Sequence, residues 1–185
     1  RTLAVGKPSL EMCKCFTQVL QGMIAVSRVR FPKGLSGRDL DALARTRLWE
    51  VGQDYDHGTG HGVGSFLSVH EGPQRISRTA AVQLEPGMII SVEPGYYRAQ
   101  AFGIRIENLV VVQEAEQLMH SGSHSMLDFE TLTYAPIDRQ LILRDMMTDY
   151  EIAWLNTYHC NVFKKLSEHL TPEASKWLRT ATMAI

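Results

Sequence analysis

The sequence predicts an α+β domain, because helical patterns occupy both ends of the chain and strand-like segments occupy its middle. Apolar residues recur at helical spacing near the N-terminus and again after residue 148, whereas the apolar segments between residues 88 and 112 are short and bounded by Pro-Gly turns. The 185 residues are 44% hydrophobic and 21% charged, as in an ordinary globular domain.

Two helices are expected first. Residues 8–29 carry a broad apolar stripe at helical spacing, which suits a helix packed on a sheet. Ser36 offers an N-cap to a second helix that Gly52 ends. A glycine-rich segment, residues 57–64, follows that helix.

Strands are expected over Met88–Val92 and Gly103–Val112, with a further short strand over Leu132–Tyr134. A capping box at Thr148–Glu151 predicts a third helix that runs to about residue 170. Thr171-Pro172 then predicts the start of a short final helix.

Charge and composition argue against several classes of protein. The 19 basic and 20 acidic side chains leave a formal charge of -1, so no electrostatic footprint for nucleic acid is expected. The longest apolar run is far short of the roughly 20 residues of a membrane helix, and no signal peptide pattern opens the chain. The odd count of three cysteines suits a reducing compartment, with Cys13 and Cys15 expected as buried thiols.

Several residues attract attention without a motif to support them. His120, His124, His159 and His169 are expected to be surface or structural residues. The three tryptophans, Trp49, Trp154 and Trp177, lie in predicted helices and are expected to be packing residues.

His57, His61 and His70 lie within 14 positions of one another and are candidates for chemistry. A helical zinc pair at His57 and His61 is rejected, because four of the eight residues 57–64 are glycine, and each costs a helix about 1 kcal/mol. A phosphate-binding loop is also disfavoured, because no Lys-Ser/Thr pair follows. Glycine here permits close approach of the backbone to other strands.

Glu93 and Glu107 follow apolar alternation and are expected to project from a sheet, whereas Glu85 precedes its strand and is expected in an exposed turn. One interpretation is an ordinary salt-bridge network with Arg105. The other is a metal site, because two carboxylates and an imidazole that share one cavity repel and desolvate each other unless a cation binds them. Such ligands suit Mn, Co or Fe, with Zn possible. Both interpretations remain open on the residues alone.

Five ordered blocks carry a resemblance to a known family: Asp56–Gly64, Val69–Pro73, Leu84–Met88, Glu93–Tyr97 and Gly103–Asn108. They resemble Xaa-Pro aminopeptidase (aminopeptidase P), a family of metallopeptidases with the pita-bread, or creatinase-like, fold. The segment Trp154–His159 resembles the C-terminal helical extension of the eukaryotic cytosolic form. The resemblance implies that residues 1–138 are the C-terminal part of the catalytic domain and residues 139–185 are the helical extension.

The resemblance also implies a mechanism. The family uses two divalent metal ions, usually manganese, with zinc or cobalt possible, and His61, Glu93 and Glu107 match three of its five ligands. A metal-bound hydroxide attacks the carbonyl of the bond before proline, and Glu93 relays the proton. His70 resembles the histidine that steadies the oxyanion, while His57 and Arg105 resemble residues that shape the subsite beyond the cut.

The expected partners are peptides with proline at the second position and a second copy of the chain, since eukaryotic members are cytoplasmic homodimers. The apolar stripe of the helix over residues 148–170 is a minority candidate for the dimer contact, and packing in the core is the default. No nucleic acid or membrane partner is expected.

The family's two aspartate ligands would precede Arg1, and the chain has no initiator Met, so the sequence reads as a piece of a longer enzyme. We expect the 185-residue piece to be inactive on its own, because it lacks these two ligands. Prolidase, a dipeptidase on the same fold, is the main alternative, and a metal-free pita-bread protein that recognises peptides is the alternative from another class. Methionine aminopeptidase shares the ligand set but lacks the glycine-histidine block.

Overall fold

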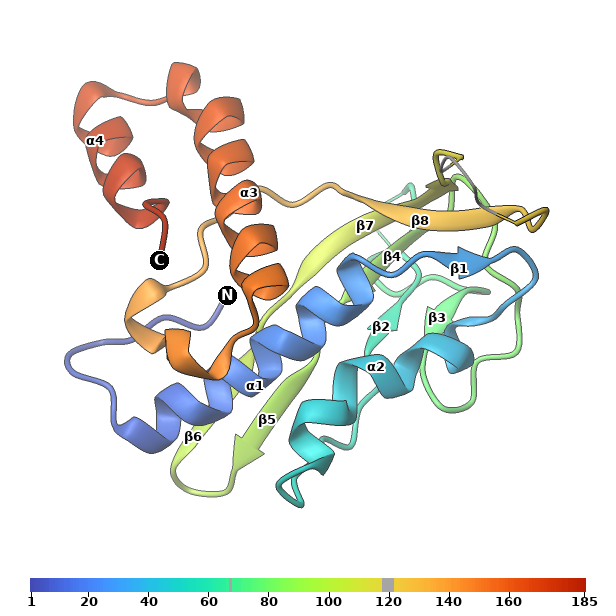
Figure 1. Ribbon diagram of the computed structural model, residues 1–185, viewed down its shortest axis with the longest axis horizontal. Coiled ribbons are helices and arrows are strands. Elements are labelled where there is room, and N and C mark those ends of the chain that lie inside the picture. The colour runs from blue at the N-terminus through green and yellow to red at the C-terminus, as the bar shows by residue number, and fades with distance from the viewer. Residues whose placement is uncertain (67, 118–121) are drawn as a thin grey trace.

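The computed structural model describes residues 1–66, 68–117 and 122–185. Helices lie at both ends of the chain and strands lie between them, as the sequence predicts (Figure 1). The helices are α1 (Leu10–Ser27), α2 (Gly37–Trp49), α3 (Asp149–Leu166) and α4 (Pro172–Ala181), with short 3-10 turns at Arg139–Leu141, Arg144–Met146 and Ser167–His169. The strands are β1 (Phe31–Pro32), β2 (Gly60–His61), β3 (Arg75–Ile76), β4 (Ile89–Val92), β5 (Gly95–Arg98), β6 (Phe102–Arg105), β7 (Asn108–Glu114) and β8 (Met126–Thr131).

All the strand pairs are antiparallel. A four-stranded sheet has the order β1-β8-β7-β4, and two hairpin-like pairs, β2-β3 and β5-β6, stand beside it. An isolated bridge between Gly62 and Ile90 joins the β2 segment to β4. The strands and α1 form two layers, because α1 contacts β4, β5, β6 and β8 along its length (Figure 1).

Helix α1 begins one residue after Ser9, whose side chain accepts a hydrogen bond from the Met12 amide. Pro8 therefore precedes the helix and does not form its first turn. Most of α1 is buried, including both Cys13 and Cys15, and burial raises the pKa of each thiol. The expectation of buried thiols is confirmed.

Helix α2 has the predicted N-cap. Ser36 and Asp39 form a reciprocal capping box, and hydrogen bonds from Ser36 lower the pKa of the Asp39 carboxyl. The helix ends at Trp49, and Gly52, with φ of 73°, turns the chain away. Val51 lies past this end and is exposed.

The strand predicted over Gly103–Val112 is in fact two strands, β6 and β7, that pair with different neighbours. The break covers residues 106–107 and faces a matching break at residues 93–94, between β4 and β5. Pro94 has no amide hydrogen to donate to a ladder, which explains the interruption there. The two interruptions place Glu93 and Glu107 on facing segments.

The strand predicted over Leu132–Tyr134 is wrong, because the strand before it, β8, already ends at Thr131. β8 fills the gap between β1 and β7, and the Leu132 amide makes one last bond to the Leu109 carbonyl. The strand over Met88–Val92 is confirmed as β4.

Helices α3 and α4 begin as the sequence predicts. Thr148 and Glu151 form the capping box of α3, and Thr171 caps α4 with Pro172 in its first turn. Helix α3 ends at Leu166, four residues short of the expected end, and a 3-10 turn follows. No helix of the described residues is both long and apolar enough to cross a membrane.

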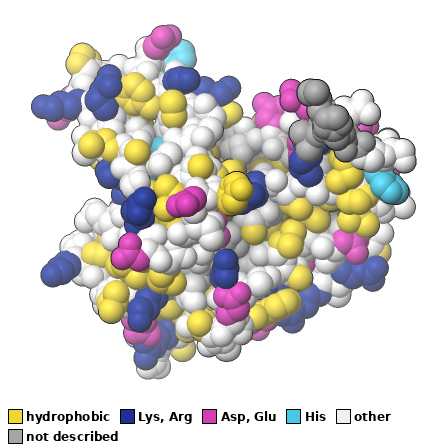
Figure 2. All heavy atoms as spheres, viewed as in Figure 1, with side chains coloured by type: hydrophobic (Ala, Val, Ile, Leu, Met, Phe, Trp, Pro, Cys, Tyr) yellow, Lys and Arg dark blue, Asp and Glu magenta, His cyan; other side chains and the backbone are white. Residues whose placement is uncertain are grey.

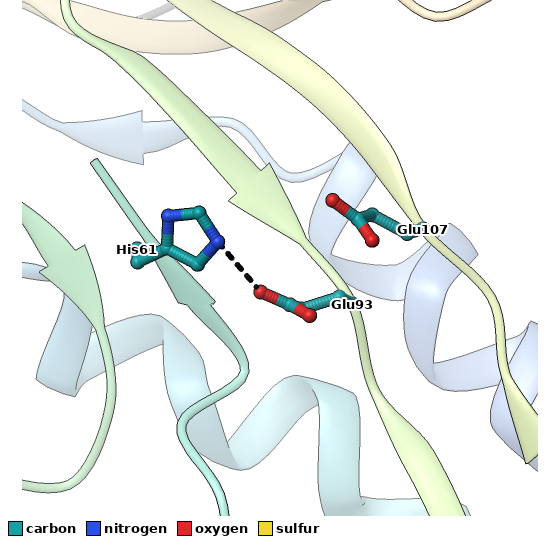
Figure 3. A group of neighbouring side chains, drawn as sticks. All are labelled: His61, Glu93 and Glu107. Carbon is teal, nitrogen blue, oxygen red and sulfur yellow. Dashed lines mark ion pairs between the residues drawn. The ribbon is translucent and has the colours of Figure 1, made fainter. Parts of the chain in front are cut away.

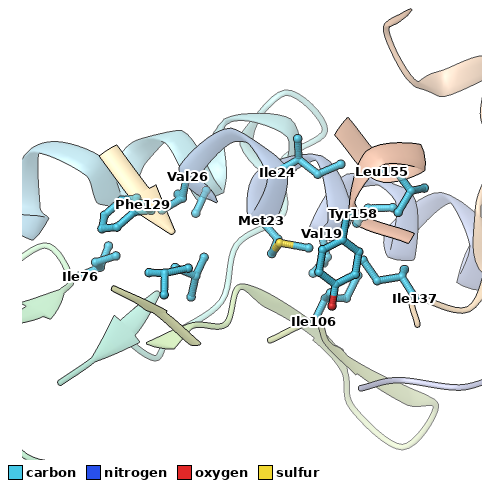
Figure 4. Packing of buried hydrophobic residues seen from close by; sticks show 14 of the residues in the cluster. Val19, Met23, Ile24, Val26, Ile76, Ile106, Phe129, Ile137, Leu155 and Tyr158 are labelled. Carbon is cyan, nitrogen blue, oxygen red and sulfur yellow. The ribbon is translucent and has the colours of Figure 1, made fainter. Parts of the chain in front are cut away.

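One hydrophobic core joins the layers. Val19 and Met23 of α1 face the strands, Ile24 lies on the opposite side of the helix, and Leu155 and Tyr158 of α3 close the core at one end (Figure 4). Charges of both signs are interspersed over the face in Figure 2.

The predicted packing role of the tryptophans holds only in part. Trp154 packs partly buried against the core, whereas Trp49 is 44% and Trp177 63% exposed, because both stand on the outer faces of their helices. Among the candidate structural histidines, His159 is buried and His124 and His169 are exposed, while His120 lies outside the described residues.

Candidate metal centre

His61, Glu93 and Glu107 come together from three separate segments of the chain. His61 ends β2, Glu93 follows β4, and Glu107 precedes β7. Each offers one ligand atom, and these atoms all lie within 4.8 Å of one another (Figure 3). This is the group that the sequence singled out.

Glycines bring the segment of His61 against its neighbours. A Cβ on Gly60 would lie 1.8 Å from the Ser91 carbonyl oxygen, and one on Gly62 would lie 2.0 Å from the Glu71 carbonyl oxygen. No side chain fits at either position, so only glycine allows this segment to lie so close to β4 at Ser91 and to the backbone of Glu71. The close approach that the sequence predicts for the glycine-rich segment is present.

The imidazole of His61 is oriented by its own backbone and aimed at a carboxylate. Its Nδ1 lies 2.9 Å from the Gly62 carbonyl oxygen, which can only accept, so Nδ1 carries the hydrogen. Nε2 therefore keeps its lone pair, and it faces Oε1 of Glu93 at 3.1 Å. These two electron-rich atoms need a cation or a proton between them. In metal-binding histidines, the ring nitrogen that does not bind the metal commonly donates a hydrogen bond to a backbone carbonyl, as Nδ1 does here.

Glu93 is buried, with 7% of its surface exposed, and its two oxygens have different partners. Oε1 accepts a hydrogen bond from the Ser91 hydroxyl at 2.9 Å, and Oε2 lies 3.5 Å from Nη1 of Arg105. The interpretation of these residues as an ordinary salt-bridge network expects an ion pair with Arg105, and Glu93 forms one. Arg105 does not neutralise the second carboxylate, because Glu107 forms no ion pair within the described ranges.

The donor set fits a divalent cation. One imidazole and two carboxylates supply nitrogen and hard oxygen atoms, the combination that manganese, iron, cobalt and zinc accept. A cation would also remove the repulsion between Glu93 and Glu107, which one guanidinium at the edge leaves uncompensated.

A chain of hydrogen bonds runs beside this group, through a residue that the sequence did not single out. Nε of Arg105 donates to the Tyr97 hydroxyl at 2.7 Å, and that hydroxyl lies 2.8 Å from Nε2 of His57. Because Nδ1 of His57 faces the Gly58 carbonyl, Nε2 accepts the proton of Tyr97. The contact with Tyr97 raises the pKa of Arg105, with Glu93 and Glu107 contributing.

His70 completes the histidine set. Its ring centroid lies 4.0 Å from that of His61, and its side chain is exposed. All the predicted site residues except Glu107 line one open cleft of about 400 Å³, together with Gly58, Gly60, Arg75, Ser77 and Thr79.

A buried ionic cluster under the cleft fixes the loop that carries His57. Arg45 of α2 is bidentate to Asp41 and also donates to the carbonyl oxygens of Tyr55 and His57, at 2.7 and 2.9 Å. Asp41 accepts from the Thr59 hydroxyl at 2.6 Å. The Thr59 carbonyl in turn accepts the Glu93 amide at 2.7 Å, so the cluster connects α2 to two of the site segments.

The charges within this cluster stabilise one another. Burial alone would raise the pKa of Asp54, but the hydrogen bond from Arg45, at 2.7 Å, together with those from Trp49 and the Tyr55 amide and the Arg45 charge, lowers that pKa to about 2. Burial is the largest single effect on Arg45 and acts against its charge, but the hydrogen bonds to Asp41 and Asp54 and the nearby negative charges together outweigh burial and raise the pKa of Arg45. The Arg45 guanidinium and the Asp54 carboxylate therefore stay charged at neutral pH.

Comparison with known proteins decides the family. The profile of "Metallopeptidase family M24" matches residues 1–114, and that of the C-terminal region of peptidase M24 matches residues 125–185. The chain belongs to metallopeptidase family M24. The predicted resemblance to the Xaa-Pro aminopeptidases is confirmed. The α+β architecture is the pita-bread fold of M24 proteins.

Several M24 relatives that are similar in sequence are aminopeptidases by name. A probable Xaa-Pro aminopeptidase P of Tuber melanosporum is 48% identical over 190 residues, which covers 100% of this chain and 31% of the relative. Aminopeptidase P1 of Arabidopsis thaliana is 47% identical and covers 98% of this chain and 29% of the relative. The chain thus spans about 30% of the length of the curated M24 relatives that it matches.

Solved M24 structures agree. The X-prolyl aminopeptidase of Caenorhabditis elegans, described as a cytosolic enzyme with a di-nuclear active site, superposes with a TM-score of 0.92 at 40% identity. It covers 100% of this chain, which in turn covers 30% of it. The prolidase of Pyrococcus horikoshii superposes with a TM-score of 0.55 at 34% identity, over 60% of this chain and 31% of its own.

Proposed function

We propose that this chain forms part of a metal-dependent aminopeptidase that removes the N-terminal residue of peptides whose second residue is proline. The observation that carries the proposal is the convergence of His61, Glu93 and Glu107 at one end of a cleft lined by His57, His70 and Arg105. The names of the two aminopeptidase P relatives described above suggest the reaction.

In this proposal His61, Glu93 and Glu107 hold two divalent cations together with ligands from the rest of the enzyme. When bound, such cations acidify water and polarise a carbonyl group. The hydrogen bond from Nδ1 of His61 to Gly62 keeps Nε2 free as a ligand atom. The Ser91 hydroxyl holds Oε1 of Glu93 toward His61.

The remaining residues handle the peptide. Glu93 takes the proton of the attacking water on its carboxylate and passes it to the departing proline nitrogen. His70, exposed beside His61, donates a hydrogen bond to the oxygen of the scissile carbonyl as charge develops there. His57 and Arg105, linked by Tyr97, shape the cleft on the proline side of the cut.

Prolidase remains the second candidate, since prolidases superpose on part of this chain. The aminopeptidase is favoured because its likeness extends through α3 and α4 to 100% of the chain, whereas the prolidase covers 60%. We further propose manganese as the metal and a cytoplasmic homodimer as the assembly. The apolar stripe of α3 packs in the core, since Ile152, Leu155, Tyr158 and Val162 are buried there, which is the default that the sequence indicated.

A substitution of Glu93 tests the function. We expect Glu93→Gln, in the intact protein that carries this chain, to lower kcat for Ala-Pro-Gly hydrolysis with Mn²⁺ at least ~100-fold, because Gln neither takes up a proton nor compensates a cation. The matched control is Glu85→Gln, since Glu85 lies in an exposed turn. Wild-type cleavage of Ala-Ala-Gly as fast as Ala-Pro-Gly, or full activity of Glu93→Gln, would contradict the proposal.

A further inference from the structure

Arg75 stands directly opposite His61 in the two-stranded ladder of β2 and β3. Residues opposite each other in an antiparallel pair project from the same face of the sheet, with Cβ atoms about 5 Å apart. Arg75 accordingly lines the same cleft as His61, His57 and Arg105. Neither the spacing of the motifs nor the family resemblance pointed to it.

The guanidinium of Arg75 has no charged partner among the residues that the structure describes. Its one side-chain hydrogen bond runs from Nη2 to the Thr79 carbonyl at 3.3 Å, and the side chain is exposed. The neighbouring arginines differ, because Arg105 pairs with Glu93 and Arg78 pairs with Asp54. An unpaired guanidinium facing the cleft is an anion-binding group without an anion.

The positive charge of Arg75 decides which part of a peptide can lie against this side of the cleft. The substrate of an aminopeptidase has a free α-amino group, largely protonated at neutral pH, on the residue that is cut off. A cation repels that ammonium, so the N-terminal residue does not lie against Arg75. The peptide beyond the proline is the part that runs toward this wall.

We propose that Arg75 binds a carboxylate of the peptide on the proline side of the scissile bond. This inference rests on the proposed function. The carboxylate is supplied either by the free C-terminus of a short peptide or by an acidic side chain that follows the proline. Arg75 is in this sense a specificity-determining residue, and it takes no part in bond cleavage.

Binding of paired peptides tests the assignment, measured by NMR titration of the metal-free 185-residue chain so that turnover does not interfere. Ala-Pro-Gly is compared with Ala-Pro-Gly-amide for the C-terminal source, and Ala-Pro-Glu-amide with Ala-Pro-Gln-amide for the side-chain source. We expect the charged member of at least one pair to bind about fivefold more tightly, the range of an exposed ion pair. Added salt should reduce the difference.

Variants separate Arg75 from general charge effects. Arg75→Gln should bring the two members of each pair within about twofold, while Arg75→Lys should keep part of the preference. Arg38→Gln, an equal change of charge on the exposed side of α2, should leave it intact. Equal affinities in the wild type, or a preference that survives Arg75→Gln, would overturn the assignment. A different result would count against the proposed function itself: if replacing proline with alanine in the amide peptides leaves their affinities unchanged, the cleft does not recognise proline.

Discussion

Tyr97 shows how one hydroxyl organises two basic side chains of the cleft. It accepts from Arg105 and donates to His57, so it holds the guanidinium and the imidazole at a fixed separation. Without the hydroxyl, Arg105 would keep only its longer contact with Glu93, at 3.5 Å, and His57 would keep only the hydrogen bond between Nδ1 and the Gly58 carbonyl. Tyr97 therefore acts through its neighbours as a positioning residue.

We expect Tyr97→Phe to lower kcat/KM for Xaa-Pro peptides by about 10-fold, the cost of losing a hydrogen bond to a charged group. Most of the loss should appear in KM, because His57 and Arg105 shape the peptide subsite and do not relay the proton. Steady-state kinetics with Tyr96→Phe as the matched control measure this, since the Tyr96 ring packs partly buried beside Phe102. Equal kinetics for Tyr97→Phe and wild type would show that the hydroxyl does not position the cleft.

Among single residues, the sequence predicted the candidate metal ligands. It did not predict the residues whose position in the cleft depends on how the strands pair. Glu93 and Glu107 were found because the alternation around them predicted that both project from a sheet, whereas the choice of His61 among the three candidate histidines came from the family resemblance. Tyr97 and Arg75 were missed because their importance depends on which strand lies opposite. The alternation of the Gly95–Arg98 segment was the one signal for Tyr97, and it needed the pairing with β6 to be read.

Among the elements, the interrupted ladder is the one that builds the site. β4 pairs with β7, β5 pairs with β6, and the residues between them, 93–94 and 106–107, face each other across the break. The sequence predicted continuous alternation through Ile104, Arg105, Ile106 and Glu107, and the inward burial of both isoleucines bears that out. Local alternation does not record a change of partner strand, so the break itself was not predicted.

The N-terminal starts of α2, α3 and α4 were predicted better than the short strands. The caps at Ser36, Thr148 and Thr171 are local hydrogen bonds between residues a few positions apart, so the sequence contains them in full. The two-residue strands β1, β2 and β3 are defined by distant partners, and nothing in two residues predicts a partner. The six-residue strand β8 was also missed.

Helix α3 is fastened to the rest of the chain by a buried imidazole. Nε2 of His159 accepts the Ile137 amide at 3.1 Å, and Nδ1 has no partner among the described residues. Burial, reinforced by the nearby charges of Arg139 and Arg1, lowers the pKa of His159 to about 4. The folded chain therefore holds this histidine neutral where an unfolded chain would protonate it.

This gives the docking of α3 a defined pH dependence. Between pH 6.5 and pH 4 the unfolded state takes up a proton that the folded state refuses, so stability falls as the pH falls. The expected loss from His159 is about 2 kcal/mol between pH 7 and pH 5. Urea unfolding at both pH values should show this loss in wild type, and His159→Gln, whose amide oxygen can still accept from Ile137, should reduce it. An equal loss in both proteins would assign the pH dependence to other groups.

At the scale of the whole molecule, the fold brings together three segments that are 32 and 14 residues apart in sequence, from His61 to Glu93 and from Glu93 to Glu107. The Arg45 cluster holds the first segment, β4 and the facing breaks hold the other two, and α1 covers the sheet that carries them. Arg1 contributes as well, since its guanidinium bonds the Glu107 carbonyl, the Asn108 side chain and the Tyr158 hydroxyl. The metal centre is thus connected to α3 through a short polar path.

The central claim is that His61, Glu93 and Glu107 together bind a divalent cation, and paramagnetic Mn²⁺ tests it most directly. With less than one equivalent of Mn²⁺, we expect the amide NMR signals of residues 60–62, 92–95 and 106–109 to broaden first, whereas Mg²⁺ at the same concentration should broaden none. Glu107→Gln should weaken the effect at all three segments together. Broadening that begins instead around exposed carboxylates such as Glu114 and Glu116, and leaves His61 sharp, would contradict the account.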